Sequence, residues 1–175
     1  MAGTGNVRIT KGEKESLTVQ ADENLLEYLT TEVSDSRLIL GSRNCYPIHP
    51  TKEVTYTIVA KDLNRIALSG SGNITANAFG NSKFSIDLSG SGSITASGSS
   101  DSLSGDLSGS GHIDTSELKA NSVSISIAGS GTATSWCVKS LSAFISGSGR
   151  VEYYGRPELS QSISGSGSVR SLGEK

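Results

Sequence analysis

Residues 66–76, IALSGSGNITA, contain the pattern that decides the fold. Its centre, Ser69-Gly70-Ser71-Gly72, returns along the chain at intervals of 18 to 20 residues. The later copies are Ser89–Gly92, Ser108–Gly111, Ala128–Gly131, Ser146–Gly149 and Ser164–Gly167. Copies at so regular a spacing indicate a repeat protein, in which each repeat is one structural unit that stacks on its neighbours.

Apolar and polar residues alternate around each copy of the motif. A period of two predicts a strand with one face turned inward. The position before the motif is expected to line one dry ridge of the core, and it holds Leu68, Leu88, Leu107, Ile127, Ile145 and Ile163. A second short strand is expected after the motif, where the inward position holds Ile74, Ile94, Ile113, Ala133, Val151 and Val169.

The glycines of each copy are predicted to form the corner between these two strands. Glycine reaches positive φ without a steric penalty, and its missing Cβ lets successive corners stack at the strand spacing of about 4.8 Å. The predicted corner glycines are Gly70, Gly72, Gly90, Gly92, Gly109, Gly111, Gly129, Gly131, Gly147, Gly149, Gly165 and Gly167.

We therefore predict an all-β fold, a right-handed, single-stranded β-helix or β-solenoid with coils of about 19 residues. Roughly eight or nine coils and under about 10% helix are expected. The alternative is an up-and-down β-barrel, because this period also suits an array of hairpins. A barrel needs two tight turns in each period, whereas residues 112–128 contain no glycine and no Asn-Gly or Asp-Gly pair.

Residues 1–175 are expected to form a single domain, with regular repeats over 63–172. The segment 1–62 is interpreted as degenerate coils, with a cap as the alternative, because terminal repeats are usually atypical. Within it, Gly3-Thr4-Gly5-Asn6-Val7 echoes Gly70-Ser71-Gly72-Asn73-Ile74. Residues 24–28 are expected to form a helical turn, and 45–50, which include two prolines, a loop.

Composition excludes several classes of function. The net charge is −2 and no basic block exists, so no nucleic-acid partner is expected. No apolar run approaches the ~20 residues of a transmembrane helix. The cysteines, Cys45 and Cys137, lack the spacing of a zinc site or a disulfide framework. We expect no metal and no cofactor.

Arrangements that suggest catalysis are interpreted as structural or solvated. GxG recurs between strands, whereas a phosphate-binding loop feeds a helix N-terminus. His112 and Asp114 are expected to project together from one short strand as a solvated pair, without a nucleophile elbow. Asp114 and Glu152 share a column roughly 9.6 Å apart, which leaves a carbohydrate-active enzyme as a distant alternative. Asp87 and Asp106 are expected to be outward neighbours.

The chain also resembles a known family. The segments that carry the resemblance are GTGNVRIT (3–10), ADENLLEYLTTEV (21–33), EVTYTIVA (53–60) and DLNRIALSGSGNIT (62–75), followed by the later SGSG copies. They resemble the putative auto-transporter adhesin head family, known as the GIN domain. The resemblance implies a β-helical domain, usually in exported bacterial proteins, and it offers no catalytic residues to carry over.

The large aromatic residues mark a candidate contact patch on a side face. Trp136 and Tyr154 occupy the same offset in adjacent coils, five residues after the motif. Exposed rings beside arginines are typical of contact surfaces; the alternative is that the rings pack a bend of the coil. The patch comprises Trp136, Phe144, Arg150, Tyr153, Tyr154 and Arg156.

We therefore expect a non-enzymatic binding or adhesion module. Its partner would be an unknown protein or glycan at the cell envelope, with the chain exported to the periplasm or cell surface; a cytoplasmic location is the alternative. A self-assembling structural subunit, a homo-oligomer stacked through open strand edges, is the second hypothesis. The carbohydrate-active enzyme is the third.

Overall fold

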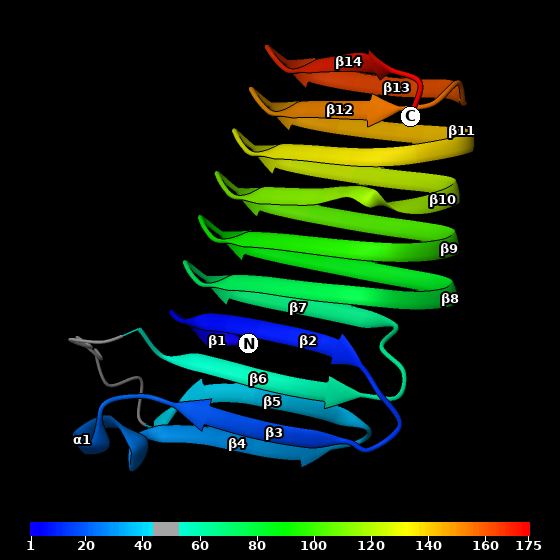
Figure 1. Ribbon diagram of the computed structural model, residues 1–175. Coiled ribbons are helices and arrows are strands. Elements are labelled where there is room, and N and C mark those ends of the chain that lie inside the picture. The colour runs from blue at the N-terminus through cyan, green and yellow to red at the C-terminus, as the bar shows by residue number, and fades with distance from the viewer. Residues whose placement is uncertain (44–52) are drawn as a thin grey trace.

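The computed structural model describes residues 1–43 and 53–175, in which strands wind about one axis in a stack of about six turns (Figure 1). Helix accounts for 3% of the structure described by these residues, so the expectation of little helix is confirmed. Cys45 and the loop predicted at 45–50 lie outside the described residues.

The regular coils run from β7 to β14, and neighbouring strands in the stack pair in parallel. The motifs stack in register: Gly90 faces Gly109, and Gly109 faces Gly129. The strands are β7 (Arg65–Gly70), β8 (Asn73–Gly90), β9 (Ser93–Gly109), β10 (His112–Gly129), β11 (Thr132–Gly147), β12 (Arg150–Tyr154), β13 (Glu158–Gly165) and β14 (Ser168–Gly173).

Parallel pairing confirms the predicted β-solenoid with coils of about 19 residues and rules out an up-and-down barrel, whose neighbouring strands are antiparallel. Each of β8 to β11 leaves one glycine corner, bends at the far end of the coil and returns to the next corner (Figure 1). We call the part that follows a corner the first side of the coil, and the part that leads to the next corner the second side. In β11 the first side, Thr132–Trp136, pairs with β12, and the second side, Ser140–Gly147, pairs with β13.

The N-terminal residues add one more corner to the stack. β1 (Ala2–Gly3) and β2 (Asn6–Lys11) pair in parallel with β7 and β8, with Gly3 opposite Gly70 and Asn6 opposite Asn73. The echo of the motif in the first residues is therefore confirmed as a real corner.

The strands that follow form a cap, one strand of which, β6, also pairs in parallel with β2 and so extends the stack. β3 (Ser16–Gln20) pairs antiparallel with β6 (Thr55–Ala60), and β4 (Leu29–Ser34) pairs antiparallel with β5 (Arg37–Ser42) in a separate sheet. The short helix α1 (Glu23–Leu26) precedes β4, where the sequence predicted a helical turn. Antiparallel pairing of β3, β4 and β5 fits the alternative of a cap, whereas β6 continues the coils, and the expected number of eight or nine coils is wrong.

The physical reason is that apolar alternation fixes a strand but not its direction. No GSG corner follows β3 or β4, so nothing feeds each strand into a parallel neighbour. The cap still contributes to the core, because Leu40 and Tyr56, which are 4% and 2% exposed, belong to the same apolar cluster as the coils.

The core is a continuous column of apolar side chains between the two sides of the coils. Five of the residues that precede a corner are at most 2% exposed: Leu68, Leu88, Leu107, Ile127 and Ile145. Ile163 is 39% exposed, because β13 pairs with β11 and the described chain places no further strand on its other edge. The predicted dry ridge is therefore confirmed for five of its residues and wrong for Ile163.

The two glycines of each corner are required for different reasons. The first has positive φ, as in Gly129 at 130°. The second has no such backbone except at the N-terminal corner, where Gly5 has a φ of 132°. A Cβ on Gly131 would lie 2.6 Å from the carbonyl oxygen of Gly111 and would also collide with Leu107. The corners are joined by hydrogen bonds, since the carbonyl of Gly109 accepts from the amides of Ser130 at 2.9 Å and Gly131 at 3.1 Å.

Candidate functional site

Two aromatic rings lie next to each other on the first side of the stack. Trp136, at the end of the first side of β11, pairs with Tyr154 at the end of β12, and both side chains are half-buried. In the preceding coil, Lys119 of β10 pairs with Trp136, and its Nζ lies 5.4 Å from the centroid of the indole ring. We call Lys119, Trp136 and Tyr154 the aromatic cluster.

A second lysine reaches this cluster from the segment that follows β14. The Nζ of Lys175 lies 5.5 Å from the centroid of Trp136 and 5.3 Å from that of Tyr154. The same atom donates to the carbonyl oxygen of Ser116 at 2.6 Å and forms an ion pair with Glu117. Lys175 therefore bridges β10, β11 and β12 across the outside of the stack.

Arginines do not stack on these rings in the described contacts. Arg156 forms an ion pair with Glu174, one residue before the bridging lysine. Arg150 is exposed at the opposite end of β12, beside Thr132 and Ser168. Lysine ammonium groups, not the guanidinium groups suggested by the sequence, thus hold the positions over the rings.

The other two predicted patch residues lie elsewhere. Tyr153 alternates inward, opposite Ser135, and packs against the apolar core. Phe144 is 51% exposed but belongs to the second side of β11, between Ser126 and Ser162. The predicted patch is therefore divided: Trp136, Tyr154 and Arg156 share one region, and Phe144 faces away from it.

Sequence offsets could not have found Glu117, Lys119 and Lys175. The strand register shifts between Thr115 and Lys119, so position counting from the motif does not place Lys119 beside Trp136. Lys175 lies beyond the last repeat, where no periodic signal exists. Only the aromatic pair itself stood at equal offsets, and it is the part that the sequence identified.

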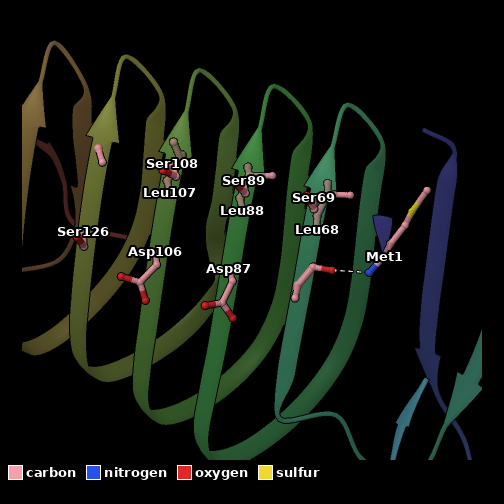
Figure 2. A pocket seen from close by; sticks show the side chains of 12 residues that line it. Met1, Leu68, Ser69, Asp87, Leu88, Ser89, Asp106, Leu107, Ser108 and Ser126 are labelled. Carbon is pink, nitrogen blue, oxygen red and sulfur yellow. Dashed lines mark hydrogen bonds between the residues drawn. The ribbon is translucent and has the colours of Figure 1, made fainter. Parts of the chain in front are cut away.

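A shallow groove of about 420 Å³ crosses the second side of the first coils (Figure 2). Asp87 and Asp106 pair in register there, as expected of outward neighbours, and Arg65 Nε lies 2.9 Å from Asp87 Oδ2. The amino group of Met1 donates to the carbonyl oxygen of Ala67 at 2.7 Å, and burial lowers the pKa of that amino group. The lining residues are Met1, Ala67, Leu68, Ser69, Asp87, Leu88, Ser89, Asp106, Leu107, Ser108, Ser126 and Ala128.

The residues considered for catalysis are not assembled into a reaction centre. Asp114 and Glu152 share an outward column, but Thr134 stands between them. Asp114 Oδ1 accepts a hydrogen bond from the Ser116 amide at 3.0 Å, which supports the local turn. Cys137 is fully buried, and burial raises the pKa of its thiol, which disfavours the reactive thiolate.

Metal sites and membrane spans can be assessed over residues 1–43 and 53–175. Within these ranges, His, Cys, Asp and Glu side chains do not gather in threes as metal ligands would. The same ranges contain no helix with the length and hydropathy needed to cross a bilayer.

This chain is similar to a known protein family and to several crystal structures. The family model described as "Putative auto-transporter adhesin, head GIN domain" matches residues 1–157, which confirms the resemblance in the sequence. A crystal structure of a putative adhesin from Bacteroides fragilis is 24% identical, with a TM-score of 0.79, over 98% of this chain and 90% of that chain. A search of curated proteins finds no match.

Two further structures come from Parabacteroides distasonis. One is a putative adhesin, 22% identical with a TM-score of 0.64, over 98% of this chain and 90% of that chain. The other is described as a putative lipid binding protein, 24% identical with a TM-score of 0.64 over the same shares. At these identities the likeness shows a shared fold.

Proposed function

We propose that this chain, which belongs to the family of putative auto-transporter adhesin head GIN domains, is an exported, non-enzymatic binding module that contacts its partner through the aromatic cluster. Membership of an adhesin family supports a place at the cell surface and a role in attachment. The partner would be a protein or glycan of the cell envelope.

The observation that carries this proposal is the pairing of Trp136 with Tyr154 on an outer face whose other outward side chains, such as Thr134 and Glu152, are polar or charged. Along β11, the outward positions before Trp136 are Thr132 and Thr134, whose side chains offer little area for tight binding. Rigid aromatic rings bury a large area at little cost in conformational entropy, so binding energy concentrates on them.

The absence of catalysis is part of the proposal. The thiol of Cys137 is closed inside the core, and Asp114 and Glu152 belong to different coils with a threonine between them. A glycoside hydrolase needs two carboxyl groups that face one bound sugar from opposite sides. A single outward column on a flat face does not provide that arrangement.

A saturation-binding experiment tests the contact surface. The chain, fused to a fluorescent protein, is incubated with intact cells of the bacterium that makes it, and bound fluorescence is measured by flow cytometry. We expect Trp136→Ala and Tyr154→Ala each to weaken binding at least ~10-fold, as truncation of an anchor residue does. Phe144→Ala is the matched control, because it removes an exposed ring from the other side, and it should change binding less than ~2-fold. Loss with Phe144→Ala and not with Trp136→Ala would contradict the assignment.

End-to-end assembly is the second candidate function. Leu159 and Ile163 are 38% and 39% exposed on the last coil, where a further coil would cover them. Gln161 lies between them at an inward position, opposite Ala143, and interrupts that apolar surface. We place this candidate second for that reason.

A further inference from the structure

The ammonium group of Lys175 has the partners of a bound ligand. A lysine ammonium carries one positive charge and three N–H donors and accepts no hydrogen bond. Here it meets the Ser116 carbonyl oxygen at 2.6 Å and the Glu117 carboxylate. Two electron-rich rings, Trp136 and Tyr154, lie within 5.5 Å. Aromatic faces attract an ammonium within about 6 Å, and a carboxylate adds a charge-assisted hydrogen bond.

The groups that hold this ammonium all belong to the solenoid itself. Ser116 and Glu117 lie in the β10 bulge, which Asp114 holds through its hydrogen bond to the Ser116 amide. Strand pairing sets Trp136 beside Tyr154. The receiving groups are therefore positioned by three stacked coils, whereas the segment after β14 supplies the ligand, Lys175, and the residue before it, Glu174, which pairs with Arg156.

We propose that Ser116, Glu117, Trp136 and Tyr154 form a receptor for the primary ammonium group of a lysine side chain, and that Lys175 occupies it until a partner lysine takes its place. The inference rests on the proposed function, because it names the chemical group recognised at the same surface. A neutral sugar hydroxyl would leave the Glu117 charge without a counterion. The receptor therefore selects a basic protein surface over a neutral glycan.

The tethered lysine is held loosely enough to be replaced. The ion pair between Arg156 and Glu174, which anchors the segment, has side chains that are 82% and 64% exposed, and exposed pairs contribute little stability. A short tether presents its ligand at an effective concentration on the order of millimolar. Removing Lys175 should raise the apparent affinity for an external lysine by the inverse of the fraction of sites that Lys175 leaves free.

Fluorescence of Trp136 provides the test, because it is the only tryptophan of the chain. The probe is the tripeptide acetyl-Gly-Lys-Gly-amide, titrated into the wild-type chain and into Lys175→Ala. We expect a saturable change in both, with an apparent Kd at least ~3-fold lower in Lys175→Ala. In the Lys175→Ala background, Glu117→Gln should raise the Kd at least ~3-fold. The same peptide with an acetylated lysine should give no saturable change.

Lys83→Ala is the matched control, because it removes an exposed lysine from the second side of β8, away from the receptor. It should leave the Kd within ~2-fold. An equal gain from Lys83→Ala, binding of the acetylated peptide, or no saturable change with Lys175→Ala would each overturn the proposal. If the lysine peptide binds the chain but the Trp136→Ala variant still binds cells as the wild type does, the receptor stands and the adhesion role fails. If Trp136→Ala abolishes cell binding and the peptide neither binds nor competes, the adhesion role stands and the receptor fails.

Discussion

At the scale of single residues, the corner glycines give a test that separates backbone strain from lack of space. Gly129→Ala places a Cβ at a positive φ and against the corner below, and Gly131→Ala places one against Leu107. We expect each to lower the free energy of unfolding by at least ~2 kcal/mol in urea titrations. The control is Gly80→Ala, whose added Cβ would lie 3.3 Å from Ser99 Oγ and which should cost less than ~0.5 kcal/mol. Equal costs at all three positions would contradict the corner assignment.

Two buried hydroxyls in one inward column give a second residue-level test. Thr115 Oγ1 donates to the carbonyl oxygen of Thr134 at 3.0 Å, whereas Ser135 Oγ is buried without a partner. Desolvating an unpaired hydroxyl costs free energy that removing it recovers. We expect Ser135→Ala to leave the free energy of unfolding unchanged or raise it by up to ~1 kcal/mol, and Thr115→Val to lower it by ~1 kcal/mol. Destabilisation by Ser135→Ala beyond that of Thr115→Val would show that Ser135 has an essential partner.

At the scale of elements, the two ends of the stack differ. The cap joins the core at the N-terminal end, whereas β13 pairs with β11 and β14 pairs with β12, each along one edge. Amides of β13 and β14 are expected to exchange with solvent faster than those of β9 and β10, which are bonded on both edges. Hydrogen–deuterium exchange read by mass spectrometry at low and high protein concentration checks this. Protection of β13 that grows with concentration would instead favour end-to-end assembly.

At the scale of the whole molecule, the regular coils were predictable because their constraints repeat. Each inward residue pairs with the equivalent residue of the next coil, as Leu68 does with Leu88. The same need for an apolar side chain therefore recurs at equal offsets in the sequence. The alternation and the glycine spacing together specify parallel stacking in register. The aromatic pair was predictable for the same reason, because Trp136 and Tyr154 share one offset.

The remaining parts depend on contacts without a repeat. Antiparallel pairing of β3 with β6 joins segments whose alternation is compatible with either direction. The bulge that moves Lys119 beside Trp136 changes the length of one coil locally, and Lys175 arrives from outside the periodic region. Only three-dimensional packing decides these positions.

The place of β2 between β6 and β8 has a consequence for biosynthesis. A ribosome makes β2 before both strands that flank it, and the nearer of them in sequence begins at Thr55. Until then Val7 and Ile9, which end at 2% and 7% exposure, have no neighbouring strand to cover them. Pairing between distant segments is slow because chain closure must come first. A nascent chain threaded through a membrane from its N-terminus would therefore remain unfolded over its first segment, in the state that a translocation channel accepts.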